Sequence, residues 1–162
     1  MDAVELLITQ HRTLEQLLDE AVDEEDDDKR MALFARAGDH LTVHIASEEQ
    51  VFYPAVNAAR TEDILLESLE EHLSLKRLLA DLLELDPNEK TFSPKLKVLQ
   101  EQTEHHHKEE EEHLFPKVKK LINEEERETL GKQMMDLQKQ MLREGEPRDN
   151  VVNETSSAAP LK

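Results

Sequence analysis

Two stretches of the chain repeat the same side chains at the same spacing, and those side chains are of the types that bind metal ions. Residues 44–56 read His-Ile-Ala-Ser-Glu-Glu-Gln-Val-Phe-Tyr-Pro-Ala-Val, and residues 106–118 read His-His-Lys-Glu-Glu-Glu-Glu-His-Leu-Phe-Pro-Lys-Val. Because helical positions i and i+4 share a face, the His and the Glu four residues later point the same way in each copy. Two such pairs facing each other would supply most of a metal site.

Long amphipathic helices are the elements that must position these side chains. Leu, Glu, Lys, Gln and Ala dominate and only three glycines occur, which favours helix. Apolar residues recur at spacings of three and four over residues 4–23, 29–59, 61–85 and 93–122. Four such helices with short connections predict an all-α fold, an up-down-up-down four-helix bundle.

The bundle is expected to occupy residues 1–122, with kinks at Pro54 and Pro116, where a proline falls inside a helical pattern. Asn123 followed by three glutamates is a helix start signal and predicts an additional C-terminal helix within residues 123–143. Residues 144–162 lack periodicity and are predicted to form a flexible tail.

Each of the four helices places one histidine in its apolar stripe, and two helices add a carboxylate one turn later. Burying carboxylates without a compensating charge costs several kcal/mol, roughly, which favours a cation among them. Imidazole with carboxylate suits Zn, Fe, Mn, Ni or Cu, and six ligands including two carboxylates suit two bridged metals better than one closed zinc site. The predicted metal ligands are His11, His44, Glu48, His72, His106 and Glu110.

The second copy of the repeat allows a register one residue later, in which His107 pairs with Glu111. The shared frame with the first copy favours His106 with Glu110, so His105 and His107 are expected to point outward. Glu111 would then hold a ligand histidine in orientation, as carboxylates beside metal ligands often do.

Other polar residues near the predicted site receive weaker assignments. His40 and His113 are expected to lie behind the ligands or at the surface. Glu49 is expected to orient a ligand histidine in the same way as its counterpart in the second copy. Tyr53 and Phe115 are expected to pack.

Composition excludes several classes of protein. The chain has no cysteine, which removes disulfides, thiolate metal sites and cysteine nucleophiles. Its net charge of −18 repels nucleic acid phosphates and anionic membranes. No apolar run is long enough to span a membrane and the N-terminus lacks the features of a signal peptide, so a cytoplasmic location is expected. Metal ions and small oxidants are the expected partners, and the oligomeric state is left open.

At these residues the sequence resembles hemerythrin-like proteins with the HHE cation-binding domain, over about residues 3–122. The resemblance rests on Leu-Ile-Thr-Gln-His-Arg-Thr-Leu at 7–14, on the two copies of the repeat, and on Glu71-His72. It implies a hemerythrin-like bundle with a non-haem di-iron centre of two iron ions. By motif match it implies terminal ligands His11, His44, His72 and His106, and bridging ligands Glu48 and Glu110.

One position departs from the oxygen-carrying hemerythrins, which have a second histidine one turn after the ligand of the third helix. Lys76 stands there, so the site resembles the sensor- and HHE-type branch more than the reversible oxygen carriers. The sequence therefore predicts a protein that senses or binds iron, oxygen or peroxide in stress or iron homeostasis. A di-iron enzyme that consumes peroxide or acts as an oxidase, and a metal-stapled interaction module, remain as alternatives.

Overall fold

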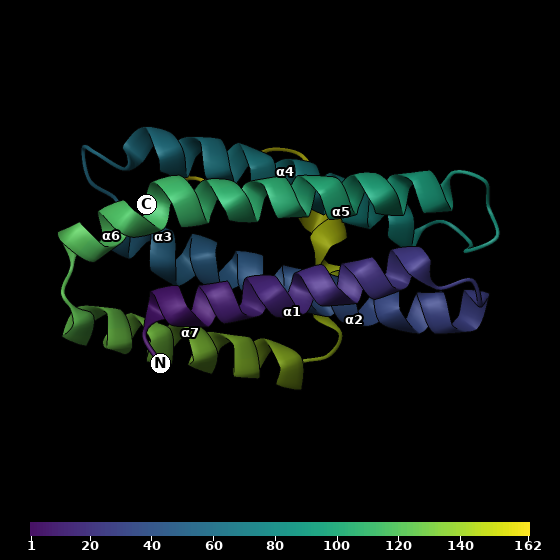
Figure 1. The fold of residues 1–162 in the computed structure, drawn as a ribbon, viewed down its shortest axis with the longest axis horizontal. Helices are drawn as coiled ribbons and strands as arrows, with labels where there is room; N and C mark the ends of the chain where they lie inside the picture. Colours follow the sequence, from purple (N-terminus) through teal and green to yellow (C-terminus); the bar gives the residue numbers. More distant parts are fainter.

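Four long helices lie side by side in the computed structural model, which describes residues 1–162 and contains no strand (Figure 1). They are α1 (Ala3–Asp23), α2 (Asp27–Ser47), α4 (Glu62–Leu83) and α5 (Phe92–Glu109). Consecutive long helices run in opposite directions, as short connections require (Figure 1). The predicted all-α, up-down-up-down bundle is confirmed.

Two of the long helices continue through a π-helical turn into a short α-helix. After α2 come a π-helical segment, Glu48–Phe52, and α3 (Tyr53–Val56). After α5 come a π-helical segment, Glu110–Leu114, and α6 (Phe115–Leu121). A proline lies in the first turn of both α3 and α6, so the two copies of the sequence repeat adopt the same local structure.

The two prolines explain these wider turns. Proline has no amide hydrogen, and its ring displaces the carbonyl four residues earlier. The amide just before each proline bonds five residues back instead: Tyr53 to the Glu48 carbonyl, and Phe115 to the Glu110 carbonyl. The kinks predicted at the prolines are thus π turns, and each begins at a carboxylate of the predicted metal site.

The predicted C-terminal helix is α7 (Glu124–Arg143), which begins at Asn123, whose side chain accepts a bond from the amide of Glu126 at 2.8 Å. It packs along α1 and α2, outside the four-helix bundle (Figure 1). The approach is close at Gly131, where a β-carbon would lie 2.7 Å from the Met1 carbonyl oxygen.

The prediction of a flexible tail over residues 144–162 is wrong, because both halves of this segment pack against the bundle. In the second half, Ala158, Ala159 and Leu161 are partly buried against the apolar core. A 3₁₀ helix, η3 (Pro147–Glu154), crosses the bundle and packs on α2 and α4. Val151 is only 2% exposed within the apolar core, and Arg148 Nη1 lies 2.8 Å from Asp39 Oδ2. Two buried side chains, Pro147 and Val151, and a few ion pairs hold a segment that is too short to show helical periodicity.

The apolar core is divided into two clusters. One contains Leu14, Phe34 and Leu79, and the other contains Leu7 and Phe52. The predicted metal site lies between the two clusters along every long helix, so it forms a polar layer across the bundle. The layer is therefore shielded from water at both ends by packed apolar side chains.

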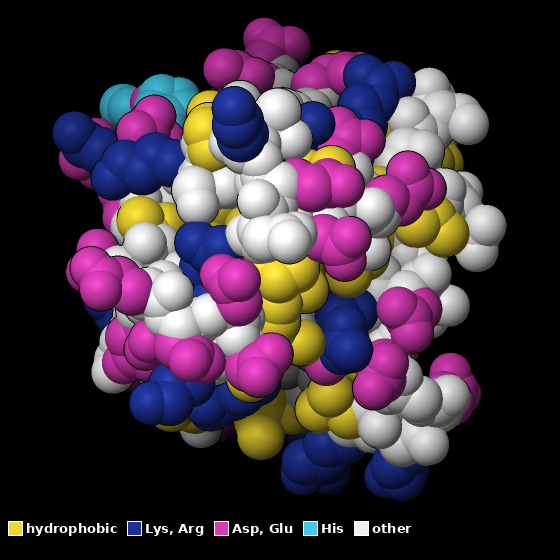
Figure 2. Space-filling view, turned by 90° about the vertical axis from the view of Figure 1, so that its right-hand side faces the viewer, with side chains coloured by type: hydrophobic (Ala, Val, Ile, Leu, Met, Phe, Trp, Pro, Cys, Tyr) yellow, Lys and Arg dark blue, Asp and Glu magenta, His cyan; other side chains and the backbone are white.

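The surface is strongly charged. Figure 2 shows acidic and basic side chains interspersed over one end of the bundle, with apolar atoms visible between them. None of the helices combines the length and apolar character needed to cross a membrane.

Candidate metal centre

The six residues predicted as ligands lie together in the buried layer, and none is more than 3% exposed. Each of the four long helices contributes to the layer, and the two carboxylates lie where α2 and α5 pass into their π turns. The residues are His11, His44, Glu48, His72, His106 and Glu110.

One group of potential ligand atoms comes from His11, His44, Glu48 and Glu110, whose atoms all lie within 4.8 Å of one another. His11 Nε2 is 3.2 Å from Glu110 Oε1, and His44 Nε2 is 3.3 Å from Glu48 Oε1. Each imidazole therefore directs Nε2 at a carboxylate oxygen in the centre of the layer.

A second group comes from Glu48, His72 and His106, with atoms within the same 4.8 Å limit. His72 Nε2 lies 3.2 Å from Glu48 Oε1, and His106 Nε2 lies 3.5 Å from Glu110 Oε1. The two imidazole Nε2 atoms are 3.1 Å apart. Each carboxylate thus contacts histidines of both groups, which is the placement that two bridging ligands require.

His107 also belongs to this layer, and the prediction that it points outward is wrong. It is 2% exposed and forms a third group of potential ligands with His11 and His44. Its ring stacks on that of His11, with centroids 3.7 Å apart and planes 8° from parallel. Neighbouring residues on a helix are about 100° apart, and a buried face can be that wide, so His106 and His107 both reach the interior. The alternative register of the second repeat, in which His107 pairs with Glu111, was the sequence feature that could have indicated a buried His107.

Every histidine of the layer turns Nδ1 away from the centre and toward a fixed acceptor. An Nδ1–H that donates to such an acceptor fixes the tautomer and leaves the Nε2 lone pair facing inward. The predicted orienting roles of Glu49 and Glu111 are confirmed. The pairs are His11–Glu111 at 2.8 Å, His44–Gln10 at 3.0 Å, His72–Glu49 at 2.9 Å, His106–Glu71 at 2.8 Å and His107–Glu15 at 2.7 Å.

Four buried polar atoms of the layer have no hydrogen-bond partner. They are Nε2 of His11, Nε2 of His44, Oε2 of Glu48 and Oε1 of Glu110. An unsatisfied buried group costs about 1–3 kcal/mol, and more when it is charged. Two lone-pair nitrogens and two carboxylate oxygens converging on one space are the donors that a divalent cation needs, so these residues fit a metal site.

The protonation behaviour of the layer agrees with this. Burial lowers the pKa of both His44 and His107 well below the ordinary value, with neighbouring imidazoles adding to the effect. Burial and the facing carboxylate of Glu110 raise the pKa of Glu48. Without a cation, the layer therefore favours neutral imidazoles at His44 and His107 and a carboxyl pair that retains a proton. Burial would also lower the pKa of His11, but its hydrogen bonds to Glu110 and Glu111 raise it overall.

Tyr53 does more than the packing predicted for it. Its hydroxyl donates to Glu110 Oε2 at 2.6 Å and lies 3.3 Å from His72 Nε2. Its ring stacks on His72, with centroids 5.4 Å apart. Burial raises the pKa of Tyr53 well above its usual range, so the hydroxyl keeps its proton and holds one oxygen of the carboxylate in place.

Lys76 is buried at the edge of the layer, and its Nζ lies 2.9 Å from Glu49 Oε1 and 3.0 Å from Glu154 Oε1. It therefore holds the carboxylate that orients a histidine, and it takes no place among the ligands. Three other histidines are exposed, as predicted, and they are His40, His105 and His113.

The helical bundle has a central layer of imidazoles and carboxylates, an arrangement that fits a metal ion. A family model described as "Hemerythrin HHE cation binding domain" matches residues 2–118, and the chain belongs to this family. Among solved structures, it is similar to a hemerythrin HHE cation binding domain-containing protein from Mycobacterium kansasii, with a TM-score of 0.76 and 22% identity. That match covers 99% of this chain and 95% of the other, so the similar fold extends over α7 and η3. No curated protein gives a significant match.

Proposed function

We propose that the chain binds two iron ions in a non-haem di-iron centre and that it senses or binds iron, oxygen or peroxide in stress or iron homeostasis. The observation that carries the proposal is the set of four unpartnered buried atoms on His11, His44, Glu48 and Glu110. They are two imidazole nitrogens from one side of the layer and two oxygens of the carboxylates at its centre, and iron accepts both ligand types.

The donors divide into two unequal sets. His11, His44 and His107 group on one side, and His72 and His106 group on the other. The carboxylates of Glu48 and Glu110 lie between the sets and contact both of them. His107 supplies a fifth imidazole from α5, which offsets the ligand that is missing at Lys76.

A bound iron pair would supply redox chemistry toward a small oxidant. The chain's own residues position the ligands before metal binds. The acceptors of the Nδ1 bonds orient each imidazole, Tyr53 donates to Glu110, and the two apolar clusters exclude bulk water. Smaller molecules such as oxygen or peroxide suit a layer this enclosed better than large organic substrates do.

Metal analysis and an absorption spectrum of freshly purified protein test the proposal. We expect about two irons per chain from this donor count, and clearly fewer after His44→Ala or Glu110→Ala. His105→Ala is the matched control, because that histidine is exposed on the same helix as the second repeat. A wild-type protein that holds zinc tightly and contains no iron would refute the proposal.

A second candidate function is a di-iron enzyme that consumes peroxide or acts as an oxidase. The unequal donor sets favour it, since the side with His72 and His106 has one imidazole fewer and so more room for an exogenous ligand. Steady peroxide turnover by the iron-loaded protein, lost in His72→Ala and kept in His105→Ala, would support it. Oxidant binding without turnover would leave the sensing function.

A further inference from the structure

A side chain of α7 enters the hydrogen-bond network of the metal centre, although α7 lies outside the residues matched by the family model. Gln138 is only 7% exposed. Its Oε1 accepts from Gln10 Nε2 at 2.6 Å, and its Nε2 donates to Gln10 Oε1 at 3.1 Å. Gln10 Oε1 is in turn the acceptor for His44 Nδ1, at 3.0 Å.

The direction of these bonds matters because a glutamine amide can face either way. If Gln10 turned its NH₂ toward His44, Nδ1 would have to accept, and the imidazole proton would move to Nε2, which faces the metal layer. The other four histidines donate to carboxylates, which offer only acceptors. His44 is therefore the one histidine of the layer whose tautomer depends on the orientation of a neighbouring amide.

Ser47 determines that orientation through Gln138. The Ser47 hydroxyl donates to the His44 carbonyl at 2.9 Å, so its oxygen can only accept from Gln138 Nε2, at 2.9 Å. The NH₂ of Gln138 must then face α2, and its oxygen must face the NH₂ of Gln10. The Gln10 oxygen then faces His44 Nδ1. The His44 carbonyl of α2, through Ser47 and Gln138 of α7, therefore determines the orientation of the Gln10 amide.

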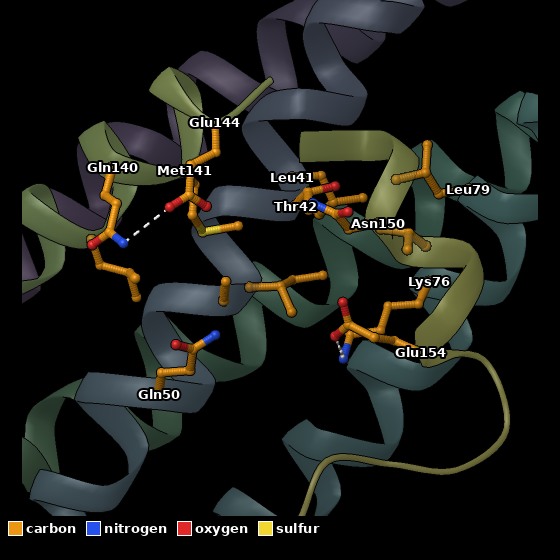
Figure 3. Close-up of a pocket in the computed structure, with 14 residues that line it drawn as sticks. Leu41, Thr42, Gln50, Lys76, Leu79, Gln140, Met141, Glu144, Asn150 and Glu154 are labelled. Carbon is orange, nitrogen blue, oxygen red and sulfur yellow. Dashed lines mark hydrogen bonds and ion pairs between the residues drawn. The ribbon is translucent and has the colours of Figure 1, made fainter. Parts of the chain in front are cut away.

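A second connection starts from η3. Glu154 Oε1 lies 3.0 Å from Lys76 Nζ, which lies 2.9 Å from Glu49 Oε1. The other oxygen of Glu49 accepts from His72 Nδ1 at 2.9 Å. Figure 3 shows Glu154 on η3 meeting Lys76 of α4 beside a cavity of about 330 Å³ that α7 and η3 close over the bundle.

We propose that the segment beyond residue 118 is part of the metal centre, with Gln138 and Glu154 as positioning residues for His44 and His72. The two connections reach one histidine in each donor set. The expected effect on iron release rests on the proposed function. The orientation of the imidazoles does not, because it follows from hydrogen bonds within the protein alone.

The test uses the full chain and two matched pairs of variants. Gln138→Met removes the amide at similar volume, and Gln140→Met makes the same change on the exposed face of α7. Glu154→Gln removes the charge that contacts Lys76, and Asp149→Asn does the same at an exposed position of η3.

Two measurements are made on each variant. Long-range ¹H–¹⁵N NMR of the metal-free protein reports the tautomer of each histidine, and a chelator reports the rate of iron release. We expect His44 to carry its proton on Nδ1 in the wild type and to show mixed tautomers in Gln138→Met. Iron release from Gln138→Met should be about tenfold faster than from the wild type. This is the low end of the effect of losing a residue that hydrogen-bonds to a metal ligand, because Gln10, the direct partner of His44, remains. Glu154→Gln should speed release by a smaller factor and alter only the His72 signals.

Ser47→Ala guards against a Gln138 variant that fails to fold, because it removes only the hydroxyl that orients the network. It should give the same mixed His44 tautomers. The proposal is overturned if His44 keeps one tautomer in Gln138→Met and Ser47→Ala, or if release rates match those of the controls. Wild-type protein without iron would defeat the proposed function, while the NMR comparison would still decide the positioning roles.

Discussion

Tyr53→Phe tests whether the Tyr53 hydroxyl stabilises the buried carboxylate of Glu110 in the metal-free protein. The change removes a single oxygen, and the ring can keep its stacking on His72. What is lost is the 2.6 Å bond to Glu110 Oε2, whose other oxygen already has no hydrogen-bond partner. The effect should therefore appear in stability without a large cavity term.

The magnitude follows from the type of bond. A hydrogen bond to a charged group contributes about 1.5–3 kcal/mol, and this one is short and fully buried, so we expect a loss of about 2–3 kcal/mol. For a protein of this size, about 2–4 °C of Tm is lost per kcal/mol, which gives a decrease of about 4–12 °C. Denaturant unfolding measures the loss of free energy of unfolding, and it is done on the metal-free protein so that bound metal does not contribute.

A double-mutant cycle with Glu110→Leu separates this bond from other effects of the hydroxyl. In that background the hydroxyl has lost its acceptor and retains only His72 Nε2, at 3.3 Å. Tyr53→Phe should then cost at least about 1 kcal/mol less than it does in the wild type. Equal costs in the two backgrounds would show that the hydroxyl does not act through the carboxylate.

Three further predictions concern the rest of the layer and its supports. His107→Phe keeps a ring to stack on His11 but removes both ring nitrogens, so iron retention should fall clearly, whereas His105→Phe should leave it unchanged. Equal iron retention in the two variants would show that His107 is not a ligand. The metal-free protein should lose stability as the pH falls from about 7 through 6.5. Burial lowers the pKa of His44, His72 and His107, so these side chains stay neutral in the folded protein while the same residues of the unfolded chain take up protons. His11 and Glu48, whose pKa values are raised, oppose this trend, and a stability that is flat or rising on acidification would contradict it. Gly131→Ala should be destabilising by about 1 kcal/mol or more in denaturant unfolding despite the higher helix propensity of alanine, because the β-carbon would meet the N-terminal backbone at 2.7 Å; an unchanged or raised stability would show that α7 can shift freely.

Periodicity and spacing predicted much of this structure. The stripes predicted the bundle, Asn123 predicted α7, and the two copies of the repeat predicted which face of each helix turns inward. The six predicted ligand residues meet in one layer because helical phase is a local property, and each residue's phase can be read from the apolar residues beside it.

Phase alone could not decide how wide the buried face is, so His107 was assigned outward. The docking of η3 depends on Val151 and on ion pairs with residues distant in sequence, such as Arg148 with Asp39. The π turns depend on which carbonyl takes the amide before each proline, a choice that spacing does not encode. These features arise from tertiary contacts, which a pattern within one segment does not contain.

The division of the apolar core has a consequence for how the metal-free molecule moves. In an ordinary bundle the middle is the last part to open, but here the middle contains the unpartnered groups, and the continuous apolar packing lies toward either end. Backbone amides near His11 and His44 should therefore exchange with solvent faster than those of the flanking clusters until a cation is added. Metal binding would then join two separately packed halves into one cooperative unit, and the centre of the protein would change from its weakest section to its strongest.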